Sequence, residues 1–136
     1  MAVISTLRVR YCETDAMGHV NNISYMIYLE QGRTDFMKEI RKNLGREVAI
    51  VLASIRCDFR APSYFDDELQ VRTEVQRVGK TSITMSQAIL RGDELIAQGE
   101  SVIVHVDPVA QRPAPIPDDL RQVLLGQMAG EVSCSS

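Results

Sequence analysis

The chain has 136 residues, 45% of them hydrophobic, and a formal net charge of -3 at pH 7, which fits one globular domain. Its weakly acidic balance, without a clustered basic stretch, excludes nucleic acid as a main partner. No stretch approaches the roughly 20 apolar residues that cross a bilayer, and the amino terminus is not typical of a signal peptide. We therefore expect a cytoplasmic protein that does not bind membranes.

The cysteines and histidines argue against a disulfide and a metal site. Cys12, Cys57 and Cys134 lie far apart and form no Cys-x-x-Cys pair. His19 and His105 form no His-x-x-x-His pair. We expect free thiols in a reducing compartment, and neither a metal nor another cofactor.

A first strand and one long helix are predicted in the first third of the chain. In residues 4–11, β-branched and aromatic side chains alternate with polar ones. Asn21 or Asn22 can cap the start of the helix, and Gly45 can adopt the left-handed conformation that ends it. Between these ends, apolar residues recur at helical spacing: Met26, Leu29, Phe36, Met37, Ile40 and Leu44.

Four strands follow, because the hydrophobic period changes to two. The last three are joined by short turns, which makes them antiparallel neighbours. One helix between a first strand and such a block indicates an α+β fold in which the sheet curls around the helix. The four strands span residues 48–59, 69–76, 81–90 and 95–106, and a proline-spaced link over 108–117 leads to a short amphipathic stretch.

We expect a single domain over residues 1–128 and a disordered tail over residues 129–136. A domain of this size buries only about two-thirds of the surface of its unfolded chain. Self-association would bury further apolar surface, so we expect a homo-oligomer.

The segment before the helix carries the candidate chemistry. It reads Asp15-Ala-Met-Gly-His-Val-Asn-Asn and leads into a helix start, whose unpaired N–H groups suit a developing oxyanion. Gly18 has no Cβ and lets a ligand come close. Asp15 can attack a carbonyl or take a proton from water. These are the parts of an acyl-transfer site.

The same segment resembles a known family. Residues 14–22 are similar to hotdog-fold thioesterases of the 4-hydroxybenzoyl-CoA thioesterase type and to their acyl-CoA and acyl-carrier-protein relatives. The resemblance runs from about residue 7 to residue 107. Its other positions are Tyr25, Glu30, Arg33, residues 59–62, the acidic strand start at 66–69, and residues 77–82.

The resemblance implies a hotdog fold, an antiparallel sheet curled around one long central helix, and hydrolysis of an acyl-CoA thioester to free acid and CoA. It implies that Asp15 acts as nucleophile or general base, and that the helix start near Gly18 to Asn22 is the oxyanion site. In the acyl-carrier-protein branch, an Asn two residues after this Asp and a His two further act in catalysis. Here His19 keeps the second place and Met17 stands at the first, so catalysis and loop ordering both stay open for His19.

The resemblance also implies how the substrate is bound. In this family the turn matching residues 79–82 contacts the pantetheine or nucleotide part of CoA across a subunit interface. The implied partner is acyl-CoA, or alternatively an acyl-carrier protein, and the implied assembly is a homodimer or homotetramer. Met17, Met26 and Val51 are candidates for the acyl pocket, and Arg60 and Lys80 for phosphate contacts. The candidate substrate-binding residues are Met17, Gly18, Val20, Asn22, Tyr25, Arg60, Gly79, Lys80, Thr81 and Ser82.

Other interpretations of the same residues stand beside these. Asp15 can simply cap a turn, and Glu30 with Arg33 can form an i,i+3 pair on the helix. His105, in an apolar strand, is interpreted as structural. For the whole protein, the alternatives are a non-catalytic acyl-CoA or acyl-carrier-protein binding protein and, ranked last, an enoyl-thioester hydratase. The hydratase pattern has a longer spacing and an Asn-Pro before its His, which are absent here.

Overall fold

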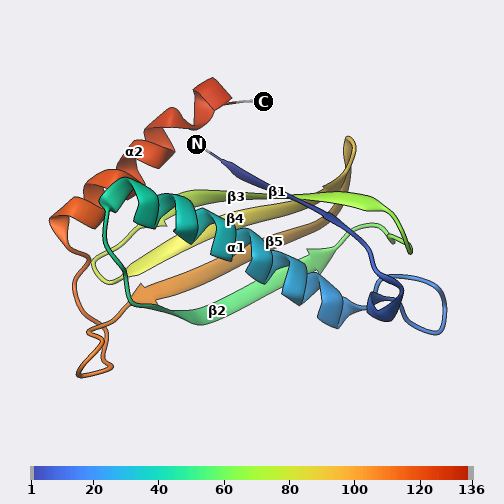
Figure 1. Cartoon of the computed structure of the whole chain (residues 1–136), viewed down its shortest axis with the longest axis horizontal. Helices are drawn as coiled ribbons and strands as arrows, with labels where there is room; N and C mark the ends of the chain where they lie inside the picture. Colours follow the sequence, from blue (N-terminus) through green and yellow to red (C-terminus); the bar gives the residue numbers. More distant parts are fainter. Residues whose placement is uncertain (1, 135–136) are drawn as a thin grey trace.

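The computed structural model describes residues 2–134, with side chains described as far as Met128, and every strand predicted from the sequence is present within a few residues of its expected bounds (Figure 1). The elements in chain order are β1 (Val3–Arg8), a short 3-10 turn η1 (Tyr11–Glu13), α1 (Asn22–Leu44), β2 (Ile50–Phe59), β3 (Glu68–Val78), β4 (Ser82–Arg91), β5 (Glu94–His105) and α2 (Asp118–Cys134).

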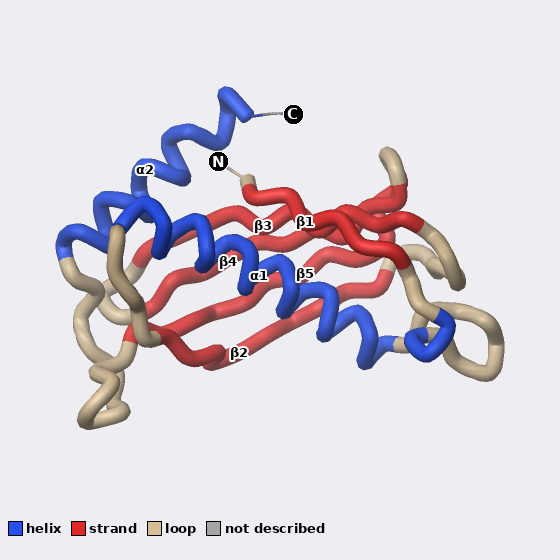
Figure 2. The backbone as a smooth tube through the Cα atoms, in the orientation of Figure 1, coloured by secondary structure: helices blue, strands red, loops and turns tan. Residues whose placement is uncertain are grey.

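The five strands form one antiparallel sheet in the order β1-β3-β4-β5-β2. Helix α1 lies along one face of this sheet, and α2 packs against α1 and β3 (Figures 1 and 2). The consecutive strands β3, β4 and β5 are neighbours, as the short turns predict. The arrangement confirms the predicted α+β hotdog fold, with the sheet around one long helix.

Helix α1 begins and ends where its capping residues predict. The side chain of Asn21 accepts a hydrogen bond from the Ser24 N–H, and Gly45 ends the helix with a φ of 74°. Leu29, Phe36 and Ile40 are fully buried between the helix and the sheet. The spacing of these apolar residues therefore places one face of α1 on the sheet.

The core consists of two clusters along α1. One cluster joins Phe36 and Ile40 to Leu120 and Leu124 of α2, so the amphipathic stretch after the proline-spaced link completes the core. The other lies under the start of α1 and includes Val9, Val20, Tyr25, Leu29 and Ile96. This second cluster supports the loop that carries Asp15.

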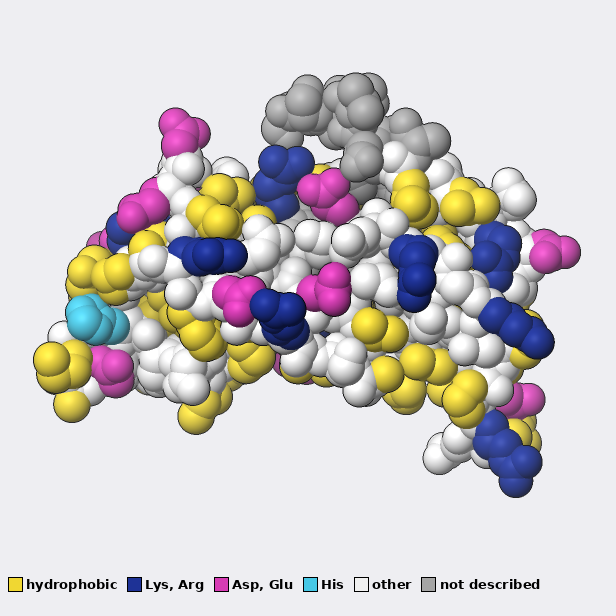
Figure 3. All heavy atoms as spheres, turned by 180° about the vertical axis from the view of Figure 1, so that it is seen from behind, with side chains coloured by type: hydrophobic (Ala, Val, Ile, Leu, Met, Phe, Trp, Pro, Cys, Tyr) yellow, Lys and Arg dark blue, Asp and Glu magenta, His cyan; other side chains and the backbone are white. Residues whose placement is uncertain are grey.

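The outer face of the sheet, away from α1, carries side chains of both charges (Figure 3). Arg56 pairs with Asp58 on β2 at 3.4 Å, and Arg72 pairs with Glu74 on β3 at 3.6 Å. Strand β2 forms one edge of the sheet. Its residues Val51 and Leu52 are about half exposed, at 50% and 47%, so this edge presents apolar surface next to unpaired backbone groups.

Two predictions from the sequence concern the carboxyl-terminal residues and the location of the protein. The backbone of α2 continues to Cys134, whereas the side chains after Met128 and residues 135 and 136 lie outside the described part. Disorder over residues 129–136 therefore stays a prediction. Within residues 2–134, no helix combines the length and the apolar character needed to cross a membrane, and a cytoplasmic location stays a prediction.

Candidate active site

Asp15 opens a tight turn that its own side chain stabilises. The Gly18 N–H donates to the Asp15 carbonyl at 3.0 Å, and Gly18 closes the turn with a φ of 85°. The Asp15 Oδ1 accepts the N–H groups of Met17 at 2.8 Å and His19 at 3.2 Å. No donor from the described residues bonds to the Asp15 Oδ2. One carboxylate oxygen thus caps the turn, and the other is available to a ligand.

The start of α1 presents free backbone donors beside this carboxylate. Asn21 accepts from the Ser24 N–H through its side chain at 2.8 Å and from the Tyr25 N–H through its carbonyl at 3.4 Å. In the described chain, the N–H groups of Asn22 and Ile23 make no hydrogen bond. Such groups carry the partial positive charge of a helix start. They can stabilise an oxyanion that forms next to Asn22.

Asp15 and Asn22 line the same cavity, which has a volume of about 360 Å³. One side of it comes from the Asp15 turn and the start of α1. The other side comes from residues 59–62. We call residues 59–62, together with Ser63 and Tyr64 that follow them, the 59–64 wall. The lining residues are Asp15, His19, Val20, Asn22, Tyr25, Phe59, Arg60, Ala61 and Pro62.

The 59–64 wall is joined to the Asp15 side by Ser63 and Tyr64. The Val20 N–H donates to the Ser63 carbonyl at 2.8 Å, and the hydroxyls of Tyr25 and Ser63 lie 2.6 Å apart. The His19 ring meets the Tyr64 ring edge to face, with centroids 5.4 Å apart. Burial raises the pKa of the Tyr25 hydroxyl, which keeps it protonated.

A buried carboxylate, Glu13, supports the site from below. Its Oε1 accepts from the Tyr28 hydroxyl at 2.7 Å and from the Arg10 N–H at 2.8 Å, and its carbonyl accepts from the Asn21 N–H at 3.0 Å. Burial alone would raise the pKa of Glu13. The hydrogen bonds from the Arg10 backbone, the Tyr28 hydroxyl and the Arg10 guanidinium hold that pKa below its usual value. Glu13 therefore stays ionised and fixes the entry into α1.

The structure brings several predicted site residues together and separates others. Asp15, His19, Val20, Asn22, Tyr25 and Arg60 line one cavity, and Gly18 shapes its turn. Met17 belongs to the same turn, but its side chain is 78% exposed and lies outside the cavity lining.

The turn formed by Gly79, Lys80, Thr81 and Ser82 lies at the other end of the sheet. Ser82 pairs with Val104, whereas Phe59 beside the cavity pairs with Ala97. At about 3.3 Å per residue, these positions on β5 are roughly 23 Å apart. A CoA contact from this turn to the cavity of its own chain is therefore not formed, and a contact with a second subunit stays a prediction.

The alternative interpretation of Glu30 and Arg33 as an i,i+3 ion pair is not what the described residues show. The Arg33 Nη1 instead donates to the Gln87 Oε1 and the Ser101 Oγ, both at 3.3 Å. The Arg33 side chain therefore points toward the sheet. Its burial there lowers the pKa of the guanidinium. His105 makes a contact of 3.1 Å from its Nδ1 to the Ala114 carbonyl, in line with the structural role expected for it.

Sequence reasoning missed some residues that build the site. Glu13 and Ser63 are buried polar residues with specific partners, and Phe59, Ala61 and Pro62 line the cavity. For the last three, the resemblance over residues 59–62 was a usable signal. Glu13 and Ser63 gave none, because their partners Tyr28 and Tyr25 lie far along the chain.

Comparisons with known proteins give a consistent result. The sequence matches the thioesterase-like superfamily over residues 9–124. The acyl-CoA thioester hydrolase YbgC of Escherichia coli O6:H1 is 29% identical over 119 residues, which cover 84% of this chain and 89% of that protein. The long-chain acyl-CoA thioesterase FadM of Escherichia coli K12 is 26% identical over 123 residues, which cover 87% and 93%.

Solved structures show the same fold. The structure of a predicted thioesterase from Bacillus stearothermophilus superposes with a TM-score of 0.85 at 30% identity, over 93% of this chain and 96% of that one. A thioesterase complexed with coenzyme A and Zn from Thermus thermophilus has a TM-score of 0.81 at 25% identity, over 93% of each chain.

Proposed function

The chain belongs to the thioesterase-like superfamily, to which residues 9–124 match, and on that premise we propose that it hydrolyses acyl-CoA thioesters to a free acid and CoA. The observation that carries the proposal is the pairing of two groups in one cavity. The Asp15 carboxylate keeps one oxygen available, and the N–H of Asn22 has no acceptor among the described residues. A thioester carbonyl placed between them meets both a base or nucleophile and an oxyanion donor.

Two routes use this geometry. In the first, the Asp15 Oδ2 attacks the thioester carbon, the C–S bond breaks, and the CoA thiolate takes a proton from solvent. Water then hydrolyses the acyl anhydride and releases the acid and the Asp15 carboxylate. In the second, Asp15 takes a proton from water as the water attacks, and the departing thiolate takes that proton back. In both routes, the N–H groups of Asn22 and Ile23 stabilise the negative carbonyl oxygen.

The other residues that line the cavity bind the acyl group and the CoA part of the substrate. Val20, Tyr25 and Phe59 give the cavity apolar surface for the acyl group. Arg60 is exposed at its rim and can pair with a phosphate of CoA. His19 is held against Tyr64, which supports a role in ordering the Asp15 loop and leaves its ring next to the substrate. An acyl-carrier protein stays the alternative carrier of the acyl group.

We also propose that the protein works as a homo-oligomer built on the β2 edge. Antiparallel pairing of two β2 strands would cover Val51 and Leu52 and satisfy the open backbone groups. It would place the Ile50 end of one strand beside the Phe59 end of the other. The turn at residues 79–82, which lies near the Ile50 end, would then approach the partner's cavity.

The test is thiol release from a panel of acyl-CoAs with short, long and aromatic acyl groups. We expect turnover of at least one class by the purified protein. Thermal stabilisation by acyl-CoA without turnover of any of them would contradict hydrolysis and favour the non-catalytic binding protein. Hydration of crotonyl-CoA without thiol release would favour the enoyl-thioester hydratase instead.

A further inference from the structure

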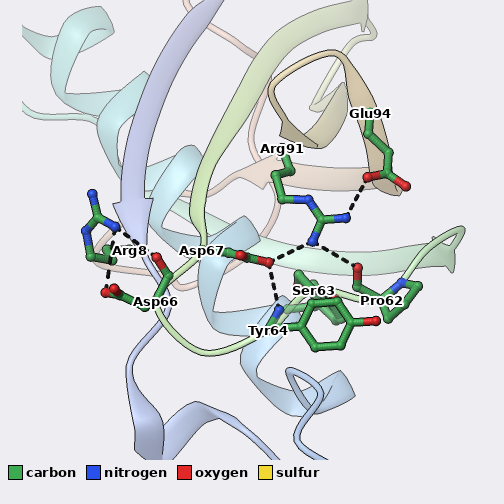
Figure 4. A network of polar contacts seen from close by, with 9 residues as sticks. Arg8, Pro62, Ser63, Tyr64, Asp66, Asp67, Arg91 and Glu94 are labelled. Atoms are coloured by element: carbon green, nitrogen blue, oxygen red, sulfur yellow. Dashed lines mark hydrogen bonds and ion pairs between the residues drawn. The ribbon is translucent and has the colours of Figure 1, made fainter.

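Arg91, the last residue of β4, forms a charged contact behind the active site (Figure 4). Its Nη1 donates to the Asp67 Oδ2 at 2.7 Å, and its Nη2 donates to the Glu94 Oε1 at 2.6 Å. The side chains of Arg91 and Asp67 are only 30% and 24% exposed. A short, charge-assisted contact with this much shielding holds its partners more firmly than a solvent-exposed ion pair.

Asp67 and Arg91 hold the 59–64 wall from its outer side. The same Asp67 Oδ2 accepts the Tyr64 N–H at 2.9 Å, and the Arg91 Nη1 also reaches the Pro62 carbonyl at 3.4 Å. The Arg91 guanidinium lies 5.8 Å from the centre of the Tyr64 ring. Figure 4 shows the Arg91 guanidinium bonded to Asp67, Glu94 and the Pro62 carbonyl, and Asp67 bonded in turn to the Tyr64 N–H. Residues 62–64 are thereby fixed to the β4 end.

On their other side, the same three residues contact either the cavity or the residues that line it. Pro62 lines it, Ser63 bonds to Val20 and Tyr25, and Tyr64 meets the His19 ring. A shift of this segment therefore moves the cavity side of the Asp15 loop. The second ion-pair group in Figure 4 does not share this property, because Arg8 bonds to Asp66 and Glu68 and is well exposed.

We propose that Arg91, acting through Asp67, is a positioning residue of the active site. It fixes Pro62, Ser63 and Tyr64 so that His19, Val20 and Tyr25 keep the cavity in the shape that accepts the thioester beside Asp15. The inference rests on the proposed thioesterase function for its kinetic consequence, but the placement of the wall can be measured without turnover. Supporting contacts of this kind matter because small displacements of substrate-holding groups lower rates strongly.

The kinetic test compares Arg91→Met with Arg8→Met, which makes the same change of charge and size at an exposed ion pair. We expect Arg91→Met to lower kcat/KM by about tenfold, and Arg8→Met to leave it within about twofold. Arg91→Lys should fall between the wild type and Arg91→Met, because a lysine can pair with Asp67 but cannot also reach Glu94 in a fork.

The structural test uses the two histidines as internal probes. His19 lies against Tyr64, and His105 lies in β5 beside Ala114, at the far end of the sheet. In NMR spectra of the imidazole C–H groups, Arg91→Met should shift the His19 signal, because the Tyr64 ring moves, and leave the His105 signal in place. Arg8→Met should shift neither.

The outcomes separate the two proposals. An Arg91→Met variant with wild-type kcat/KM and an unmoved His19 signal overturns the positioning role. So does a variant in which both histidine signals shift and the melting temperature collapses, because its effect is then general. Absence of turnover in the wild type counts against the thioesterase proposal alone, while a selective shift of His19 in Arg91→Met still supports the positioning of the wall.

Discussion

At the scale of single residues, carboxylates hold the loops around the cavity. Asp15 binds two N–H groups of its own turn with one oxygen, and Glu13 joins η1 to α1 through Tyr28 and Arg10. Each carboxylate holds in one conformation a loop that has no regular secondary structure. The difference between them is exposure: Glu13 is buried, whereas Asp15 faces the cavity. Under the proposed function, Glu13 supplies structural support and Asp15 supplies the chemistry.

Glu13→Gln should destabilise the protein by about 1–2 kcal/mol at pH 7, because a charged acceptor with buried donors is replaced by a neutral amide. The folded pKa of Glu13 lies below the ordinary value of 4.5. Its stabilisation is therefore complete above about pH 4.5 and is lost as the pH falls through the folded pKa. Urea unfolding at pH 7 and at acidic pH should show the gap to the wild type closing in acid.

The matched control for this prediction is Glu47→Gln. Glu47 pairs with Arg41 on the surface and is 91% exposed, so its loss should change the free energy of unfolding little. A gap between wild type and Glu13→Gln that is the same at both pH values would contradict the role of the ionised carboxylate.

At the scale of elements, the fit of α1 to the sheet depends on Gly32. A Cβ at this position would lie 2.7 Å from the Thr73 Oγ1, 2.7 Å from the Val71 Cγ1 and 2.8 Å from the Gln87 Nε2. Because α1 approaches the sheet closely at this point, the side chain of the fully buried Gln87 can donate to the Leu29 carbonyl at 2.9 Å. The glycine therefore sets the distance between helix and sheet.

Gly32→Ala should lower the free energy of unfolding by about 1–3 kcal/mol through overpacking, despite the better helix propensity of alanine. Gly126→Ala in α2 is the matched control, because a Cβ there would meet no atom within 4 Å beyond the nearby backbone of its own helix; it should be neutral or stabilise by up to about 1 kcal/mol. Thermal and urea unfolding measure both. Equal effects of the two substitutions would contradict the tight contact at Gly32.

The elements that local rules control could be predicted from the sequence, and the contacts between them could not. Asn21 and Gly45 mark the ends of α1 through their own conformational preferences, and the alternation of β3 fixes its buried face. In contrast, Arg91 and Ser63 depend on partners that only the folded chain brings near. Arg33 shows the same limit, because its helical spacing to Glu30 allowed an ion pair, whereas its side chain bonds to Gln87 and Ser101 of the sheet.

At the scale of the whole molecule, the single chain leaves features that a second copy would explain. The β2 edge exposes Val51 and Leu52, and the turn at residues 79–82 lies far from the cavity of its own chain. Pairing through β2 would account for both, since it covers the edge and brings one subunit's turn toward the other's cavity. The candidate site in the described chain would then be completed by its partner.

Val51→Lys should convert the wild-type oligomer to a monomer, because a charge on the edge strand opposes pairing. Light scattering coupled to size-exclusion chromatography gives the mass directly. Val109→Lys is the control: Val109 is 92% exposed in the loop after β5 and should leave the mass unchanged. A wild-type protein that is already a monomer, or a Val51→Lys variant with the wild-type mass, would contradict assembly through β2.

The most direct test of the account is the turnover of the best acyl-CoA substrate by Asp15→Asn. The amide keeps an oxygen that can accept from Met17 and His19, so the turn stays folded while the carboxylate is lost. Asp66→Asn is the control, since Asn tolerates its φ of 70°. We predict that Asp15→Asn lowers kcat at least about a hundredfold, with Asp66→Asn near wild type. Turnover by Asp15→Asn within a few-fold of wild type would contradict the assignment of Asp15 as the catalytic group.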